Sequence, residues 1–201
     1  MLLRELSHRV KNTLTVVQAI AHQTMRATAS PQEFVERFDG RLAALASTHN
    51  WLMQLDWKGA DLGSLVRDQL SPYVGEGSQR LRVEGDAVTL PPDIAMPFGL
   101  VLHELATNAA KYGALSQRTG KVDLKWSLDR GSDRRVLEFI WQEREGPRVR
   151  APARTGLGTK LIEGAIPNAQ VKREFLPEGL VCRLTVPLVE ANGQANGADS
   201  D

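Results

Sequence analysis

The segment "HELATNAAKYG" gathers several side chains that can bind a charged ligand. Glu104 and Asn108 are four residues apart, and the same spacing separates His103 from Thr107 and Thr107 from Lys111. On a helix, side chains at this spacing lie about 5–6 Å apart on one face. A carboxylate, a carboxamide and an ammonium group can therefore converge on one small target. A solvated polar face is the alternative for any single pair, but the density of polar groups favours a binding site.

Glycines and arginines later in the chain can meet a phosphate-bearing ligand. Gly156 and Gly158 precede a helix-like segment, whose N-terminus can bind an anionic phosphate through free backbone N–H groups. The preceding loop, "REGPRVRAPAR", holds four arginines together with prolines and small residues, as expected of a lid over a polyphosphate. The alternative is an ordinary basic surface loop. We predict a lid, because loops at a ligand edge often carry function.

His8 stands in a basic setting, in the stretch "ELSHRVKNTL" with Arg4, Arg9 and Lys11. An imidazole with an ordinary pKa of about 6.5 is mostly neutral at pH 7. Neighbouring cations further disfavour its charged form and can stabilise an anion that forms on it later. Taken alone, His8 could be an incidental surface histidine.

Two helices are predicted to carry this histidine. The first has an apolar seam, with His8, Thr15 and His22 on the opposite, outward stripe. The seam consists of Leu3, Leu6, Val10, Thr13, Val17, Ile20 and Thr24. "SPQE" is a capping box that begins the second helix. The seam of that helix consists of Val35, Phe38, Leu42, Leu45, His49 and Leu52. A short connection predicts a helical hairpin, which either dimerises into a four-helix bundle or docks on the rest of the chain.

The remainder of the chain alternates helices with short strands. After a boundary near residues 58–60, a helix over 61–73 is followed by strands at 80–85, 121–128, 136–142, 169–175 and 179–188. Helical spacing runs through "PPDIAMPFGLVLHELATNAAKYGAL", and another helix begins at Gly158. Helices on one side of a mixed, mostly antiparallel sheet make an α/β sandwich, so the fold class is α+β. We expect a hairpin domain over 1–58, a sandwich domain over 59–190 and a disordered tail over 191–201.

Composition argues against several classes of partner. Lys and Arg number 25 against 24 Asp and Glu, a net charge of +1, so no broad field favours nucleic acid or an acidic membrane. The single cysteine, Cys182, alternates with apolar residues in "LVCRLTV" and is predicted to be a buried, inert thiol. No apolar run reaches about 18 residues, and the first residues lack the apolar core of a signal peptide. We predict a cytoplasmic chain with no membrane segment and no nucleic-acid partner.

The four motifs together resemble the HWE histidine kinases. "SHRVKNTLTVVQAI" is similar to that family's phosphoacceptor box, whereas "HELATNAAKYG", "WQE" (residues 141–143) and "GLGTKLI" (residues 156–162) are similar to its three nucleotide-binding boxes. The resemblance covers about residues 1–188 in the expected order. It implies an ATP-binding domain of the Bergerat fold behind a phosphoacceptor hairpin.

The resemblance also implies roles for individual residues. Asn108 would ligate Mg²⁺ through its amide oxygen, consistent with the preference of Mg²⁺ for oxygen donors and phosphates. Lys111 would face the phosphates as a point charge. Glu104 would act as an outer metal contact or a catalytic base, and Glu143 would accept a hydrogen bond from the adenine amino group. The remaining nucleotide contacts would be His103, Gly156, Gly158 and Thr159.

For Trp141, residue preference alone favours a place in the core. His8 would accept the γ-phosphoryl group of ATP and pass it to an aspartate of a response-regulator receiver domain. Arg9 follows the histidine where many related kinases have a carboxylate, so Glu104 would supply acid–base assistance instead. Asn12, one turn after His8, would orient a water for dephosphorylation, and Arg9 and Lys11 would contact the partner.

The predicted function is therefore an ATP-dependent protein histidine kinase core, in a homodimer or a monomer. Glu145 stands where the family often has a glycine. This departure leaves open a histidine phosphotransfer protein with a weakened ATP-binding domain. A third interpretation is a Bergerat-fold ATPase or serine kinase in which His8 has no role.

Overall fold

The computed structural model describes residues 2–75, 77–129, 135–149 and 157–188. Within these ranges, the description of residues 2–9, 12, 27 and 157–160 is confined to the backbone. The predicted tail, residues 191–201, lies outside the described residues.

The first two helices form the predicted antiparallel hairpin, α1 (Leu2–Ala27) and α2 (Pro31–Gln54). Ser30 caps α2: its hydroxyl accepts a hydrogen bond from the Glu33 amide at 3.2 Å. The Glu33 carboxylate in turn accepts a hydrogen bond from the Ala29 amide at 2.9 Å. Pro31 occupies the first helical position, where its missing N–H costs nothing. The capping box therefore ends the turn between the two helices and begins α2, as the sequence predicts.

The predicted seams are correct only toward one end of each helix. In α1, Ile20 and Thr24 are buried, whereas Val10 is 51% exposed. In α2, Leu45 and Leu52 are buried as predicted. Within one chain Val35 and Leu42 are exposed, whereas Arg41, Ala44 and Thr48, which are not seam positions, are buried. The reason is that α2 packs against α4 of the same chain, which rotates its buried stripe away from the seam expected of a free hairpin.

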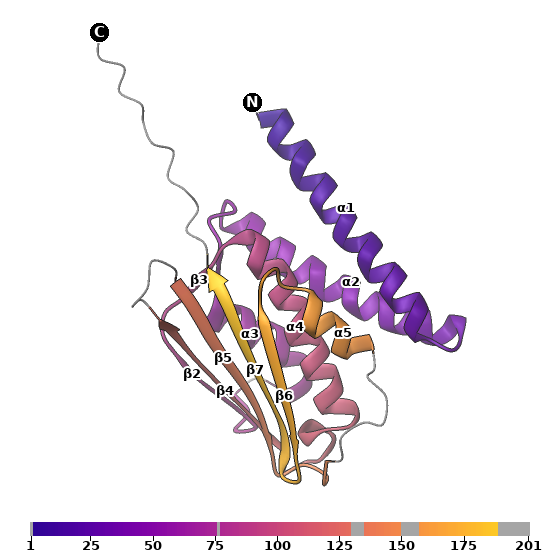
Figure 1. Ribbon diagram of the computed structural model, residues 1–201, viewed down its shortest axis with the longest axis vertical. Helices are drawn as coiled ribbons and strands as arrows, with labels where there is room; N and C mark the ends of the chain where they lie inside the picture. The colour runs from indigo at the N-terminus through magenta and orange to yellow at the C-terminus, as the bar shows by residue number, and fades with distance from the viewer. Residues whose placement is uncertain (1, 76, 130–134, 150–156, 189–201) are drawn as a thin grey trace.

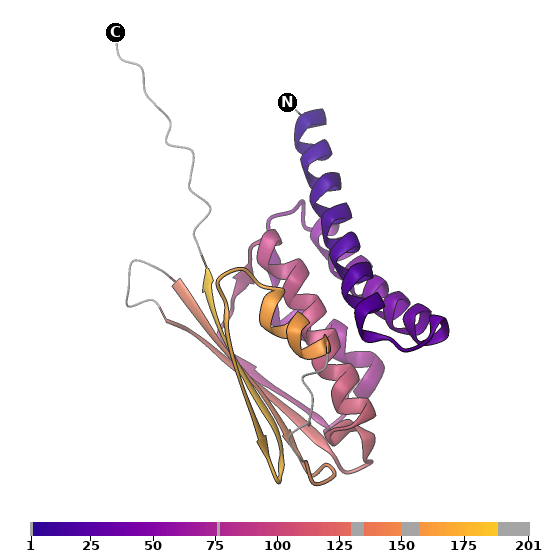
Figure 2. The ribbon, with the colours of Figure 1, turned by 45° about the vertical axis from the view of Figure 1, so that its right-hand side comes forward.

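Three helices cover one face of a five-stranded sheet (Figures 1 and 2). The helices are α3 (Leu62–Val74), α4 (Pro92–Lys111) and α5 (Leu157–Gly164). The strands are β2 (Leu81–Gly85), β4 (Lys121–Asp129), β5 (Arg135–Arg144), β6 (Gln170–Leu176) and β7 (Gly179–Leu188), in the order β2-β4-β5-β7-β6. Only the β2–β4 pair is parallel within this sheet. The hairpin lies outside the helical layer, against α4.

The predicted α+β class and α/β sandwich are confirmed. The sequence missed the pair of two-residue strands β1 (Ala60–Asp61) and β3 (Thr89–Leu90) and the 3₁₀ turn η1 (Ala114–Ser116), which are too short to show a periodic pattern. Cys182 is fully buried, and burial raises the pKa of its thiol to about 12, so the prediction of an inert core thiol is confirmed. None of the helices in the described ranges is both long and apolar enough to cross a membrane.

Candidate nucleotide-binding site

Helix α4 has an apolar face on the sheet and a polar edge toward the hairpin. Phe98, Leu102 and Leu105 are fully buried in the core, where Phe98 meets Phe139 of β5 edge to face. The polar edge contributes to a cavity of about 260 Å³ between α4, α2 and α3. The structure thus brings together the predicted residues on α4, namely His103, Glu104, Asn108 and Lys111, all of which line this cavity.

Glu104 is bound by a cation that the sequence did not single out. Its carboxylate accepts a hydrogen bond from Arg41 Nε of α2 at 2.7 Å. Arg41 is 2% exposed, and it also donates to Thr24 Oγ1 of α1 at 2.7 Å. A buried guanidinium requires such partners, because an unpaired buried charge is very unfavourable. The pair therefore ties both hairpin helices to the polar edge of α4.

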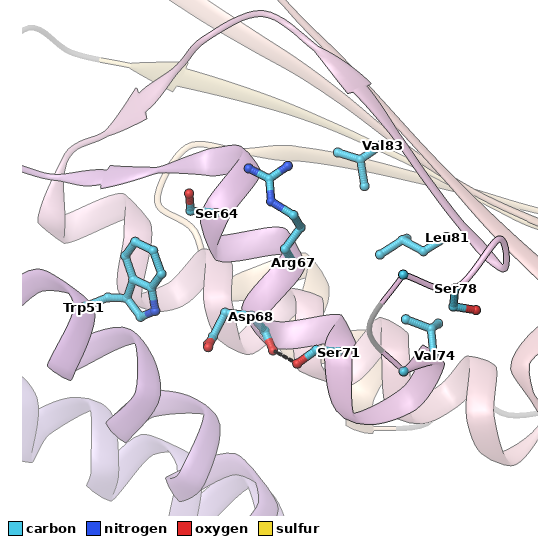
Figure 3. Close-up of a pocket in the computed structure, with 11 residues that line it drawn as sticks. Trp51, Ser64, Arg67, Asp68, Ser71, Val74, Ser78, Leu81 and Val83 are labelled. Carbon is cyan, nitrogen blue, oxygen red and sulfur yellow. Dashed lines mark hydrogen bonds between the residues drawn. The ribbon is translucent and has the colours of Figure 1, made fainter.

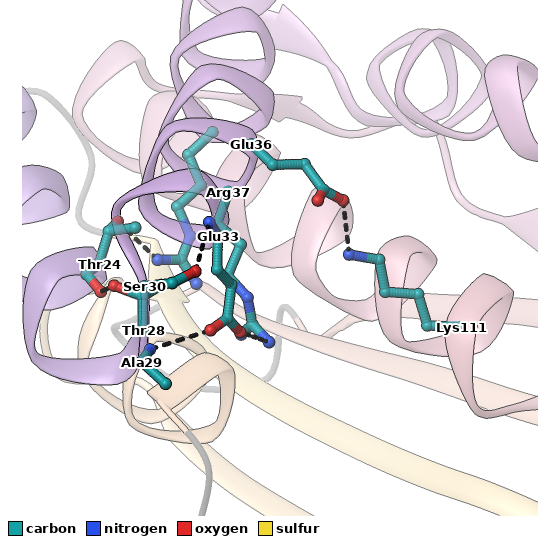
Figure 4. A network of polar contacts seen from close by, with 9 residues as sticks. Thr24, Thr28, Ala29, Ser30, Glu33, Glu36, Arg37 and Lys111 are labelled. Carbon is teal, nitrogen blue, oxygen red and sulfur yellow. Dashed lines mark hydrogen bonds and ion pairs between the residues drawn. The ribbon is translucent and has the colours of Figure 1, made fainter.

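Lys111 also contacts α2. Its ammonium lies 3.2 Å from the Glu36 carboxylate, and Figure 4 shows the two side chains bridging the helices. Their side chains are 41% and 71% exposed, so solvent screens the pair and its contribution is about 0–1 kcal/mol. Lys111 can therefore exchange Glu36 for another anion at small cost.

His103 is half-buried between α3 and α2. Its Nδ1 lies 3.3 Å from the Tyr73 hydroxyl, which also contacts Thr107 Oγ1 at 3.0 Å. A methyl group added at Gly40 of α2 would lie 3.2 Å from His103 Nε2, so the glycine permits the close approach of the helices. Burial lowers the pKa of His103, against the pull of Glu104 and with help from Arg41 and Lys111. The ring is therefore neutral at pH 7 and can accept a hydrogen bond.

Glu143 lies at the end of β5, outside the lining of that cavity. It is 3% exposed, and its Oε2 accepts a hydrogen bond from the Ala114 amide at 2.7 Å. Its Oε1 accepts from the Trp141 indole N–H at 3.2 Å. Burial raises the pKa of Glu143, and these two donors oppose the rise. Gly113 has room for no side chain, because a methyl group there would overlap the Glu143 carboxylate.

Trp141 confirms the expectation of a core residue, since it is fully buried. Glu145 takes a left-handed conformation, with φ of 56°. A glycine adopts this conformation without penalty, whereas other residues pay roughly 1–2 kcal/mol. Glu145 therefore adopts a backbone conformation that favours glycine, and Lys121 pairs with its carboxylate at 2.6 Å.

Several predicted residues fall wholly or partly outside the described residues. His8, Arg9 and Asn12 lie in α1, but their side chains are outside the description. Lys11 is exposed. Gly156 lies outside the described residues, while Gly158 and Thr159 belong to the first turn of α5, with only their backbone described.

A larger cavity lies elsewhere, between α3 and β2. It measures about 670 Å³, and Trp51, Arg67, Asp68 and Leu81 are among the residues that line it (Figure 3). None of the predicted site residues is part of this lining. The predicted residues of α4 instead line the smaller cavity at the edge of that helix.

The donors at the α4 edge suit a magnesium-bound nucleotide triphosphate. Asn108 offers an amide oxygen and Lys111 an exchangeable cation, and the neutral His103 adds a ring nitrogen. Within the described residues, no group of three or more His, Cys, Asp or Glu side chains is arranged to hold a metal ion. A magnesium ion here would rest on Asn108 and on phosphate oxygens, as this ion commonly does.

This chain is similar to known histidine kinases. Residues 5–87 match the family model described as HWE histidine kinase. A blue-light-activated histidine kinase of Brucella anthropi is 36% identical over 188 residues, which are 92% of this chain and 38% of that protein. The enzyme of the same name from Brucella ovis is 32% identical over the same shares of both chains. The chain thus spans 38% of the length of these curated relatives.

A solved structure has the same fold. The Erythrobacter litoralis EL346 blue-light activated histidine kinase is similar over 92% of this chain and 58% of its own, with a TM-score of 0.65 and 22% identity. Its separate histidine kinase domain matches over 89% of this chain and 94% of its own, with a TM-score of 0.57 and 19% identity. The likeness therefore extends across both the hairpin and the sandwich.

Proposed function

Because the chain belongs to the HWE histidine kinase family, we propose that it is a kinase core that transfers the γ-phosphoryl group of ATP to His8. The observation that carries this proposal is the convergence of His103, Asn108 and Lys111 on one cavity of α4. The group would then pass to an aspartate of a response-regulator receiver domain. Mg²⁺, when bound, neutralises phosphate charge during the transfer.

The chain's own residues supply positioning and charge. Lys111 releases Glu36 and pairs with the phosphates, and Asn108 holds the metal through its amide oxygen. Glu143, at the end of β5, accepts a hydrogen bond from the adenine amino group. Gly156 meets the phosphates together with Gly158 and Thr159 of the first turn of α5. A neutral ring nitrogen of His8 attacks the γ-phosphorus as the bond to the β–γ bridging oxygen breaks, ADP leaves, and the imidazole loses its other proton to solvent or a base.

Glu104 is our candidate for that base, and this role needs Arg41 to release it. Such a release fits a hairpin that shifts relative to α4 when His8 approaches the nucleotide. Glu104→Gln is expected to lose phosphoryl transfer while it retains nucleotide binding, because the amide keeps an acceptor for Arg41 but cannot take a proton. Transfer at the wild-type rate in this variant would rule the base role out.

The direct test is incubation with γ-labelled ATP and Mg²⁺. Acid-labile label should appear on the wild type and be absent from His8→Ala and Asn108→Ala. Label that arrives only from a phosphorylated receiver would select the phosphotransfer relay. ATP turnover that persists in His8→Ala would select an ATPase.

Two further parts of the proposal concern partners. Asn12 orients a water for dephosphorylation of the receiver, with Arg9 and Lys11 contacting that partner; a phosphatase assay of Asn12→Ala tests this. The chain forms a homodimer through its hairpin, because a second copy would bury the exposed apolar side chains of both helices, such as Leu14 and Leu42.

A further inference from the structure

Trp141 does more than fill the core, because its indole meets the carboxylate of Glu143. The two residues are two positions apart on β5, so their side chains lie on the same face of the sheet. The indole N–H is a donor that can never accept, and it reaches Glu143 Oε1 at 3.2 Å. The Ala114 amide reaches Oε2 at 2.7 Å. Each carboxylate oxygen is therefore held by its own fixed donor.

We infer that Trp141 is a positioning residue, which fixes the Glu143 carboxylate so that its remaining lone pairs face the exocyclic amino group of adenine. The inference rests on the proposed function, in which Glu143 reads that group. An ionised carboxylate has about four acceptor sites, so the two internal donors leave sites for a ligand. With one donor on each oxygen, rotation of the carboxylate would break both bonds. The ligand then meets an acceptor of set direction.

The surroundings make this anchoring strong. Trp141 is fully buried and Glu143 is 3% exposed, so water cannot replace the indole N–H if it is removed. Opposite Glu143, across the β4–β5 register, stands the apolar Val122, and Gly179 of β7 packs against the Glu143 backbone. The Ala114 amide would remain as the only donor that the described contacts provide.

The test compares ATP with inosine triphosphate, which carries a carbonyl in place of the amino group. Wild-type protein should prefer ATP, because the carboxylate accepts from an amino group and repels a carbonyl. Trp141→Phe keeps a buried ring and removes the N–H donor. The preference for ATP over inosine triphosphate should fall about three- to tenfold, the effect expected from the loss of one hydrogen bond of typical strength. General loosening of the fold would weaken the binding of both nucleotides equally and leave the ratio of their affinities unchanged.

A second readout needs no nucleotide. Loss of a donor to the charged form raises a carboxyl pKa, so the Glu143 carboxyl carbon, followed by NMR, should titrate at higher pH in Trp141→Phe than in wild type. The charged form then keeps only the Ala114 amide as a donor in the described contacts.

Trp126→Phe provides the matched control. Trp126 is also largely buried, and its indole N–H donates to the Asp86 carbonyl at 2.7 Å, away from the site. This variant should lose comparable stability yet keep both the ATP preference and the Glu143 titration of wild type. An unchanged preference or an unchanged Glu143 titration in Trp141→Phe would overturn the inference alone. A wild type that binds ATP and inosine triphosphate equally would overturn the adenine role of Glu143, and the inference with it.

Discussion

Glu104 pairs with the buried Arg41, and this ion pair decides which substitution can test its role. Replacing Glu104 with alanine would remove the carboxylate partner of the Arg41 guanidinium, which is 2% exposed. Glu104→Ala should lower the free energy of unfolding by about 3–5 kcal/mol, the cost of breaking a buried ion pair. Urea denaturation of Glu104→Ala beside Arg41→Met/Glu104→Ala checks this.

The double variant should recover most of the loss, because the buried charge is gone and Met fills the space. A fall of less than 1 kcal/mol in Glu104→Ala, or a double variant that is no better, would show that the pair is solvated. Loss of activity in Glu104→Ala alone therefore says little about catalysis, which is the reason to use Glu104→Gln.

Glu143 predicts a pH dependence of stability. Its pKa is raised from an ordinary value of 4.5 by burial, so the folded protein holds the proton more tightly than the unfolded chain. The stability that this group contributes is present below pH 4.5 and is lost as pH rises through the raised pKa. Unfolding free energies of wild type minus Glu143→Gln should therefore decrease with rising pH. A difference that is flat or increases would contradict the burial of this carboxyl.

At the scale of residues, the sequence indicated which side chains could bind a ligand but missed the residues that hold those side chains in place. Spacings of three and four residues placed Glu104, Asn108 and Lys111 on one edge of α4, because helical geometry is local. Arg41 and the indole donor of Trp141 were missed. A charged side chain between apolar seam positions is assigned to solvent by any periodic pattern, and only the tertiary contact with Glu104 accounts for its burial.

Among the elements, α2 packs closely on α4 at two glycines, Gly40 of α2 and Gly99 of α4. Gly99 of α4 lies against Thr48 of α2, so a methyl group at position 99 would overlap the threonine hydroxyl. Gly99→Ala should destabilise the fold by about 1–3 kcal/mol, the usual effect of overpacking. Thermal or urea unfolding of Gly99→Ala measures this effect.

The matched control is Gly164→Ala, because a methyl group there would meet nothing within 4 Å. Adding Thr48→Ala to Gly99→Ala should restore part of the lost stability by making room. Equal stability of Gly99→Ala and Gly164→Ala would contradict the close packing of the two helices.

Strands were predicted to within about two residues, since alternation of apolar and polar residues is a local signal with a period of two. The segment 179–188 coincides with β7. The first half of the predicted α2 seam is not buried within one chain, because the periodic pattern shows only that a helix has an apolar stripe. Which neighbour buries that stripe is a property of the whole chain, and Val35 and Leu42 ended in solvent when α2 docked on α4.

In the whole molecule, one part of the hairpin surface packs on the sandwich and another part is exposed. The later half of α1 and the middle of α2 pack on the sandwich through Ile20 and Leu45, whereas Leu14 and Leu42 remain 58% and 37% exposed. Sedimentation should show a dimer for wild type and a monomer for Leu14→Glu/Leu42→Glu, because a charge on this surface opposes its burial.

The unfolding free energy of that double variant should stay near the wild-type value, since neither side chain is buried within one chain. Gln18→Glu, an exposed change on α1, should leave the dimer intact. A monomeric wild type would contradict the proposed dimer and would mean that the hairpin is stable when docked on α4 alone.

The central claim is that phosphate from ATP arrives on one particular ring, and the position of the label tests it most directly. The chain has four histidines, and His22→Ala, an exposed position on the same helix, is the matched control for His8→Ala. After a brief reaction with labelled ATP and Mg²⁺, peptides separated at neutral pH should carry alkali-stable label only on the fragment with His8, in wild type and His22→Ala alike. Label on another fragment, or none while the protein binds ATP, would contradict the account.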